Sequence, residues 1–214
     1  RKGPETWKTA QVGGFTYPKV TGWWPGEYKS RGNFYVTAKH KLLHDAAQFR
    51  YNVEKGYLPN IFLKVAANYT IASDVLMAGK KMNQYLFMDR QFFDLIGTTY
   101  NWLNYKHILP IIHSGALFQG STNFQKAEEE YFSKERAPGL AVIDNFLSKK
   151  ALSSILEYLR ASSIWYDVKN GYLGTYMNTG LTGPLLGQIE KEIRQRMPKL
   201  IGKHPLRTIW GEYK

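Results

Sequence analysis

The 214-residue chain contains no cysteine, which excludes disulfide bonds, thiolate metal sites and cysteine nucleophiles. It has no apolar run of the roughly 18 residues that a membrane-spanning helix needs, since the longest candidate, 108–118, is interrupted by Pro110, His113 and Gly115. Glycine patterns that cradle phosphates are missing, and so is a Gly-x-Ser-x-Gly nucleophile elbow. What remains is a foldable chain, because 43% of its residues are hydrophobic and 15% are aromatic.

Histidine is scarce, and the residues around it do not match metal-binding patterns. None of the five histidines is followed two positions later by Asp or Glu, so the usual pair of a facial-triad iron site is missing. His40 and His44 are one helical turn apart, but the zinc-protease pattern needs Glu where Lys41 stands. We expect the neighbours His44 and Asp45 to point away from each other on a helix. The sequence therefore predicts no catalytic, cofactor-binding or metal-binding residue in this chain.

Positive charge is in excess, with a formal net charge of +12, which favours an anionic partner surface. That surface can be nucleic acid, an anionic membrane face or an acidic protein. The basic residues are spread along the chain without a polybasic block, so a general electrostatic attraction to a partner surface fits better than a dedicated nucleic-acid motif. The chain begins with Arg1 and not with Met, so we expect that an upstream piece was removed or is not included. A cleaved organellar leader, a cleaved secretory leader or a longer chain would each explain this, and an organellar location is favoured over a cytoplasmic one.

The first of three expected segments, 1–36, is an extended aromatic and basic arm. It has no helical or alternating period but is rich in glycine, proline and aromatic residues. Disordered tails are poor in aromatics, so we expect the arm to become ordered on a surface, either that of its own helices or that of a partner. The candidate partner-binding residues are Trp7, Tyr17, Trp23, Trp24 and Tyr28.

The second segment, 37–136, is expected to be a helical bundle. Apolar residues at helical spacing predict helices over about 37–55, 60–78 and 89–103. Asn60 is expected to cap the second helix, and Leu103 to be buried by the third.

A further helix is predicted to follow in the same segment. Thr122 and Gln125 have the spacing of a capping box at its start. We expect its acidic run, Glu128, Glu129 and Glu130, to form a solvated face.

The third segment, 137–214, is expected to be α+β. Its apolar run Leu140 to Ile143 predicts a short buried strand that leads into a helix capped by Ser148. The spacing of that helix predicts that it buries Leu152 and Leu156 with the apolar residues near them.

The remainder of this segment is predicted to hold a hairpin, a helix and a last strand. The Asn170-Gly171 pair is typical of a tight turn between strands at 166–168 and 172–177. Pro184 marks the first turn of a helix, and the last strand is expected at about 206–213. That strand has no evident sheet to join, and about four strands are too few for a jelly-roll barrel of about eight.

This third segment resembles the opening of the catalytic domain in a group of iron(II)- and 2-oxoglutarate-dependent oxygenases. The motifs that carry the resemblance are Pro138-Gly139-Leu140-x-Val142-Ile143-Asp144-Asn145-Phe146-Leu147, Ile164-Trp165-Tyr166-Asp167, Gly171-Tyr172-Leu173-Gly174-x-Tyr176, Pro184-Leu185-Leu186-x-Gln188-Ile189 and His204-Pro205-Leu206-x-x-x-Trp210. The upstream motifs Lys41-Leu42-Leu43-His44-Asp45-x-x-Gln48-Phe49-x-Tyr51 and Gly56-Tyr57-Leu58-Pro59 are similar to a helical region that precedes this domain in the same enzymes.

The resemblance covers roughly residues 39–214 and implies a helical bundle followed by a partial, jelly-roll-like β region with two packed helices. Together with the extended arm, the expected fold is of the α+β class. In that family a His-x-Asp pair and a distant histidine hold iron, and a basic residue beyond them binds 2-oxoglutarate. None of these residues is matched by a position in this chain.

Two functions are compatible with this pattern, and a third, an RNA-binding protein of an organellar ribosome, is supported by the charge alone, since the sequence shows no known RNA-binding module. In the first, the chain is a non-catalytic structural or docking subunit that is derived from the oxygenase scaffold, has no cofactor of its own and binds other protein subunits. In the second, it is the N-terminal part of an active dioxygenase whose iron(II) and 2-oxoglutarate are held by residues beyond position 214.

Overall fold

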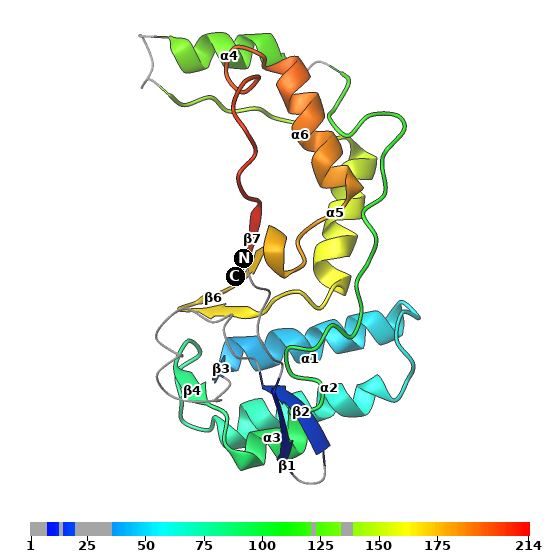
Figure 1. The fold of residues 1–214 in the computed structure, drawn as a ribbon, viewed down its shortest axis with the longest axis vertical. Helices are drawn as coiled ribbons and strands as arrows, with labels where there is room; N and C mark the ends of the chain where they lie inside the picture. The colour runs from blue at the N-terminus through cyan, green and yellow to red at the C-terminus, as the bar shows by residue number, and fades with distance from the viewer. Residues whose placement is uncertain (1–7, 13–14, 20–35, 121–122, 134–138) are drawn as a thin grey trace. The chain divides into compact units, whose positions relative to one another are not determined.

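The computed structural model describes residues 8–12, 15–19, 36–120, 123–133 and 139–214 (Figure 1). This part of the chain holds six α-helices and seven short strands, which confirms the α+β class. By packing it divides into two compact units. Unit 1 comprises residues 1–105, 163–175 and 211–214, and unit 2 comprises residues 106–162 and 176–210. The division into segments 1–36, 37–136 and 137–214 stays a prediction.

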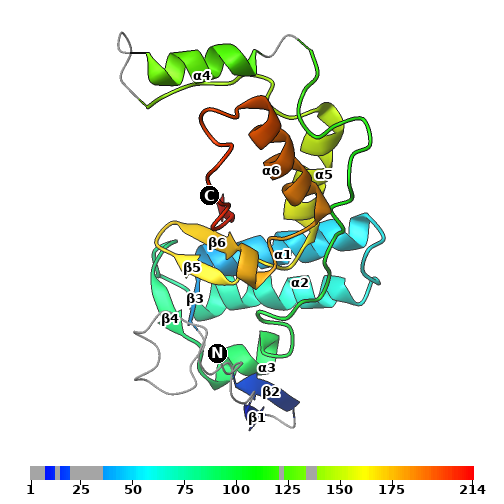
Figure 2. The same cartoon turned by 45° about the horizontal axis from the view of Figure 1, so that its top comes forward.

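The helices of unit 1 follow the apolar spacing of the sequence. They are α1 (Lys39–Glu54), α2 (Phe62–Ile71), which continues as a π-helical turn η2 (Ala72–Leu76), and α3 (Arg90–Ile96). Gly56 ends the first helix in a left-handed conformation with φ of 72°, which glycine adopts without strain. The chain then turns back at once, so α1 and α2 lie antiparallel and side by side (Figure 2).

Two predicted helix boundaries in unit 1 turn out differently. The side chain of Asn60 does not cap α2, whose N-cap is Ile61 without a side-chain hydrogen bond. The Asp89 side chain does cap α3 by accepting from the backbone of Gln91 and Phe92, but this helix ends at Ile96. Leu103 therefore lies beyond it and is exposed, so its expected burial was wrong.

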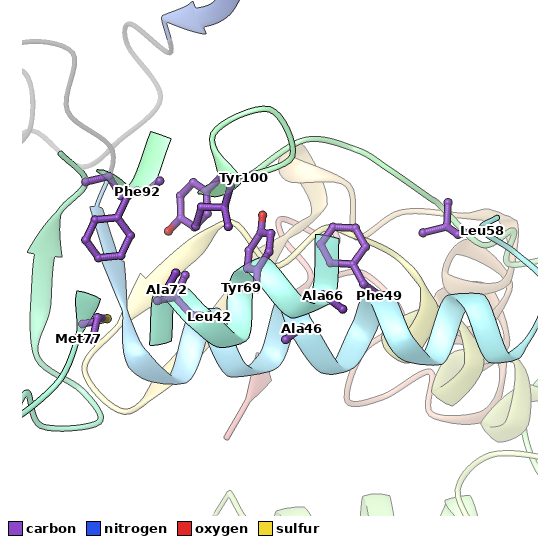
Figure 3. Close-up of a cluster of buried hydrophobic side chains, with 12 residues drawn as sticks. Leu42, Ala46, Phe49, Leu58, Ala66, Tyr69, Ala72, Met77, Phe92 and Tyr100 are labelled. Atoms are coloured by element: carbon purple, nitrogen blue, oxygen red, sulfur yellow. The ribbon is translucent and has the colours of Figure 1, made fainter. Parts of the chain in front are cut away.

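Unit 1 is held together by a core between its three helices (Figure 3). The Phe49 ring lies 5.4 Å from Tyr69 and 5.7 Å from Phe62, measured between centroids. The Tyr100 hydroxyl donates to the Val36 carbonyl at 2.6 Å. The buried members are Leu42, Ala46, Phe49, Leu58, Ala66, Tyr69, Ala72, Met77, Met88, Phe92, Ile96 and Tyr100.

The strands form three small sheets. β1 (Lys8–Val12) pairs antiparallel with β2 (Phe15–Lys19), and β3 (Val36–Ala38) pairs antiparallel with β4 (Tyr85–Phe87). In the third sheet β6 (Tyr172–Tyr176) lies between β5 (Asp167–Lys169) and β7 (Trp210–Tyr213). The described residues form no closed barrel.

The third sheet settles two expectations about the end of the sequence. The Asn170-Gly171 hairpin is confirmed, with Val168 opposite Leu173 and Gly171 at a φ of 87°. The terminal strand is shorter than predicted and begins at Trp210. It does have a sheet, because β6 supplies its partner.

Unit 2 is built from α4 (Phe124–Phe132), α5 (Lys149–Ala161), a 3-10 turn η3 (Met177–Thr179) and α6 (Pro184–Arg196). Ser148 caps α5 as predicted, since its hydroxyl accepts from the Ala151 amide at 3.3 Å. The side chain of Asn123 caps α4 by accepting from the Lys126 amide, and Thr122 lies outside the described residues. The buried Tyr158 of α5 donates to the Gly180 carbonyl, which anchors the turn ahead of α6.

Carboxylate and amide side chains of α6 bind backbone groups of another segment in unit 2. Gln188 of α6 accepts from the Ile112 amide and donates to the Ile112 carbonyl, both at 2.8 Å. One turn later, Glu192 accepts from the amides of Ala116 and Leu117 at 2.9 to 3.1 Å. The irregular segment 106–118 is therefore fixed to α6 by side chains that satisfy its backbone groups.

The acidic run Glu128 to Glu130 was expected to be solvated, but Glu128 is not. Glu128 of α4 is buried and accepts from the Leu200 amide at 2.8 Å. The backbone amide that compensates the burial of Glu128 is 72 residues away in sequence. The charge pattern around Glu128 therefore does not reveal that it is buried.

No helix in the described residues combines the length and the apolar character needed to cross a membrane.

Candidate functional site

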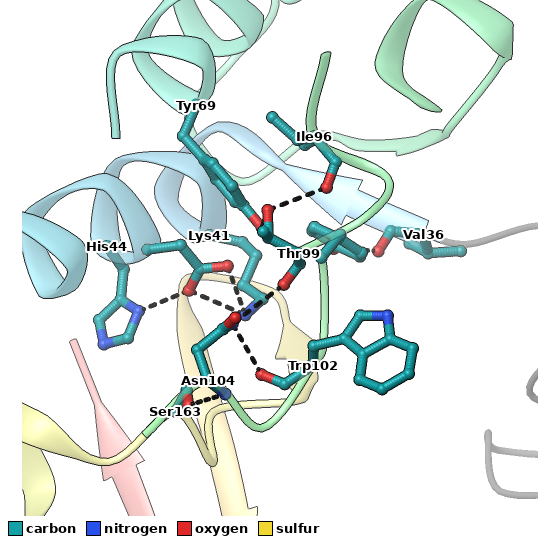
Figure 4. Close-up of polar contacts among 11 residues, drawn as sticks. Val36, Lys41, His44, Tyr69, Ile96, Thr99, Trp102, Asn104 and Ser163 are labelled. Atoms are coloured by element: carbon teal, nitrogen blue, oxygen red, sulfur yellow. Dashed lines mark hydrogen bonds and ion pairs between the residues drawn. The ribbon is translucent and has the colours of Figure 1, made fainter. Parts of the chain in front are cut away.

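Helix α1 buries polar side chains as well as apolar ones. Lys41, Asp45 and His44 are only 3%, 5% and 8% exposed, although burying charged groups is costly unless they are paired. The Lys41 ammonium lies 2.9 Å and 2.7 Å from the two Asp45 carboxylate oxygens. The dashed lines in Figure 4 mark these contacts. The three residues form a compact polar cluster inside unit 1, which we call the α1 polar cluster.

His44 and Asp45 do not point away from each other, contrary to the expectation from their adjacency. His44 Nδ1–H donates to Asp45 Oδ1 at 2.9 Å. The reason is that α1 is covered on several sides, so that eight of its sixteen residues are buried. Two neighbouring side chains then both face protein, and the short carboxylate is within reach of the imidazole.

Burial and pairing act against each other on the ionisation of this cluster. Burial by itself would raise the pKa of Asp45, but the Lys41 charge and the His44 hydrogen bond outweigh it and hold the pKa below its ordinary value. Burial lowers the pKa of His44, and the hydrogen bond to Asp45 offsets this only in part. Near neutral pH the cluster is therefore an ammonium–carboxylate pair with a neutral imidazole that donates to it.

Aromatic rings from two other segments enclose His44. The Trp165 ring lies 5.9 Å and the Tyr213 ring 4.6 Å from the imidazole, both edge-on, and the two rings are themselves 5.9 Å apart. Trp165 precedes β5 and Tyr213 is in β7. The cluster thus packs α1 against residues more than a hundred positions away in sequence.

This packing unites motifs that are separate in the sequence. Lys41, His44 and Asp45 belong to the upstream motif of the resemblance, and Trp165 belongs to a motif of the α+β segment. A sequence reading assigns each motif to its own element and has no signal for their contact. Gln188, from another motif, is explained by its bonds to Ile112 in unit 2.

The described residues do not fit the iron site of the resembled family. They contain no group of three or more His, Asp or Glu side chains that could hold a metal ion. The Nδ1 atoms of His40 and His44 are bonded to the Met82 carbonyl at 3.0 Å and to Asp45. What the structure shows for the α1 polar cluster is packing of α1 against Trp165 and Tyr213.

The aromatic residues that the sequence proposes for partner binding are not located by the structure. Trp7, Trp23, Trp24 and Tyr28 lie outside the described residues. The backbone of Tyr17 lies in β2, but its side chain is outside the description. Their role in binding stays a prediction.

An apolar surface that the sequence did not predict lies in unit 2. The run Leu140 to Ile143 is not the expected buried strand: it has no regular secondary structure, and Leu140 and Val142 are 63% and 72% exposed. Ala141 and Ile143, by contrast, pack on the core of Leu117, Phe124, Ala127 and Met197. The segment therefore has one covered apolar face and one uncovered apolar face.

The adjoining helix departs from prediction in the same way. Leu152 and Leu156 of α5 are exposed, although helical spacing predicted their burial. The buried residues of this helix are Ala151, Tyr158 and Ala161. The predicted apolar stripe is therefore not the buried face of α5, and its two leucines are 46% and 41% exposed.

Comparison with protein families, curated proteins and solved structures gives no match to this chain. The likeness to iron(II)/2-oxoglutarate oxygenases therefore rests on the sequence motifs alone. Two features of the described residues bear on function: the α1 polar cluster and the exposed apolar segment Leu140 to Ile143.

Proposed function

We propose that this chain is a non-catalytic structural and docking subunit of a larger protein assembly, built on a scaffold derived from iron(II)/2-oxoglutarate oxygenases. The observation that carries the proposal is the segment Leu140 to Ile143. It has the continuous apolar composition of a strand that is covered on both faces, yet Leu140 and Val142 are uncovered.

The backbone of this segment is also available for pairing. Residues 140–143 form no backbone hydrogen bond with other described residues. A segment with apolar side chains, whose backbone forms no hydrogen bond with other described residues, is suited to β-augmentation, in which a partner contributes a strand. The occupant we propose is an extended segment of a partner subunit, with apolar residues that cover Leu140 and Val142.

The positive net charge of the chain favours a partner that is acidic. The chain has a net charge of +12, so an acidic partner associates faster and more selectively than a basic one.

A second candidate function is the N-terminal part of an active dioxygenase, in which further strands of the same polypeptide cover Leu140 and Val142. The convergence of His44 and Trp165, from two motifs of the resemblance, favours this candidate. Iron(II) and 2-oxoglutarate would then be held by residues outside this chain. The α1 polar cluster would stabilise the packing of α1 against Trp165 and Tyr213.

The test uses a double variant, Leu140→Asp with Val142→Asp, in the protein as its natural host makes it. We expect the unmodified protein to purify in a stoichiometric complex, measured by native mass, and the variant to lose it. The control is Leu103→Asp, which changes a leucine of unit 1 that is 55% exposed and is expected to leave the complex intact.

Two results would contradict the docking proposal. One is a native mass that the double variant does not change. The other is iron(II)-dependent release of succinate from 2-oxoglutarate by the purified natural protein, which would favour the dioxygenase candidate.

A further inference from the structure

Helix α2 and the π-helical turn η2 that continues it present an apolar ridge to solvent. Leu63, Ala67, Ile71 and Val75 recur at intervals of four residues, and all four are exposed. The three large side chains are 47%, 45% and 64% exposed. Residues spaced by four share one face of a helix, so these side chains form a continuous row about 18 Å long. We call this row the α2 ridge.

The α2 ridge is not the side of the helix that packs in the core. The opposite face carries Ala66, Tyr69 and Ala72, which are fully buried between the helices of unit 1. A surface helix normally has one apolar face, and α2 has two. The second face needs its own explanation.

The charges beside the ridge have opposite signs at its two ends. Lys64 follows Leu63 and Asp74 precedes Val75, and both are exposed. Neither forms an ion pair with a residue that the structure describes. In sequence, Lys64 and Asp74 are placed symmetrically about position 69, and so are Ala67 and Ile71.

We infer that the α2 ridge is a self-association surface on which a second copy of this chain docks through its own α2, antiparallel to the first. A two-fold axis at the shared midpoint places Leu63 opposite Val75 of the second copy and Ala67 opposite Ile71 of the second copy. The same axis places Lys64 opposite Asp74 of the second copy, twice over by symmetry.

This pairing satisfies the requirements of a two-fold interface. Such a contact must be self-complementary, and here small Ala67 meets large Ile71 while positive Lys64 meets negative Asp74. Rows at four-residue spacing are also those that interdigitate in the commonest helix packing of globular proteins. A lipid surface explains the pattern less well, because an anionic headgroup layer would attract Lys64 but repel Asp74.

The strength of the contact follows from its size. One ridge of four residues is small beside the roughly 800 Å² per partner of a standard interface. We therefore expect a dimer that dissociates in roughly the micromolar to millimolar range. This interface is separate from the docking segment Leu140 to Ile143 in unit 2.

The experiment measures the mass of the purified 214-residue protein by sedimentation velocity from about 10 μM to about 1 mM. Unmodified protein should rise toward twice the monomer mass. Ala67→Glu puts a carboxylate opposite Ile71 of the second copy and should weaken the dimer at least tenfold. Met82→Glu, at an exposed apolar site elsewhere in unit 1, is the control and should change nothing.

Charge reversal tests the antiparallel pairing itself. Lys64→Asp alone and Asp74→Lys alone each create two like-charge pairs and should weaken the dimer about tenfold, whereas the double reversal should restore it to within about threefold.

The inference is overturned if the protein stays monomeric up to about 1 mM, or if it binds anionic vesicles without dimerising. It is also overturned if Ala67→Glu has no effect, or if the double reversal is as weak as either single change. The variant with Leu140→Asp and Val142→Asp should dimerise normally, which separates this inference from the docking proposal.

Discussion

Replacing Lys41 by methionine tests the reasoning about the α1 polar cluster most directly. The change keeps the length of the side chain but removes the ammonium that lies 2.7 Å and 2.9 Å from the Asp45 oxygens. Asp45, which is 5% exposed, then remains as a buried carboxylate without its cation. Breaking a buried pair in this way costs about 3–5 kcal/mol, a large share of the stability of a domain.

The chain contains a matched control for this change. Arg90 and Asp94 are also an i,i+4 pair in unit 1, but their atoms are 3.7 Å apart and their side chains are 79% and 50% exposed. Exposed pairs contribute about 0–1 kcal/mol. Arg90→Met should therefore cost far less than Lys41→Met, although both remove one positive charge from a helix.

The assay is urea unfolding followed by circular dichroism at neutral pH. A double variant, Lys41→Met with Asp45→Leu, should recover most of the loss, because it removes the unpaired carboxylate as well. If Lys41→Met lowers the free energy of unfolding no more than Arg90→Met does, the Lys41–Asp45 pair is not desolvated and the expected cost is wrong.

The dependence of this cost on pH gives the same test a second readout. In the natural chain the pKa of Asp45 is lowered, so the pair stabilises the fold above the ordinary value of 3.8 and this stabilisation is lost as pH falls through the folded pKa. Without Lys41 the pKa of Asp45 should move upward, because burial disfavours the charged carboxylate. The cost of Lys41→Met should then shrink on acidification.

Two more predictions concern His44 and Gln188. The pKa of His44 is lowered from 6.5, so stability should fall as the pH drops below about 6.5, where the unfolded chain takes up the proton first; His44→Gln should remove this slope in unfolding free energy between about pH 7.5 and pH 5. If the unfolding free energy of His44→Gln depends on pH as steeply as that of the natural chain, His44 is not the group responsible. Gln188→Leu leaves the Ile112 amide unpaired, while the Ile112 carbonyl still accepts from the Gly115 amide at 2.9 Å. The change should cost about 1–3 kcal/mol and speed hydrogen exchange in residues 106–118. Gln195→Leu, on the exposed side of α6, should not.

Local signals in the sequence were sufficient for most of the regular structure. Gly56 ends α1, Asp89 and Ser148 cap their helices, Pro184 begins α6 and the Asn170-Gly171 pair makes its hairpin. Each of these features depends on the conformational preferences of a few consecutive residues. Neighbours in the chain therefore carry the information.

The candidate sites depended on partners that are far away in sequence. The expectation that His44 and Asp45 diverge was wrong because it considered one helix in isolation, whereas α1 is covered on several sides. The run Leu140 to Ile143 has the composition of a buried strand, but composition does not say whether a neighbouring strand is there to cover it. Glu128 was expected in solvent because its partner, the Leu200 amide, lies on a different element.

The sequence by itself determined where most helices and turns lie and that the chain belongs to the α+β class. The tertiary structure decided which apolar and charged side chains are covered: it buried Lys41 and Asp45 and exposed Leu140, Val142 and the α2 ridge. The physical reason is that backbone conformation is set mainly by adjacent residues. Burial, by contrast, depends on which distant segments come together.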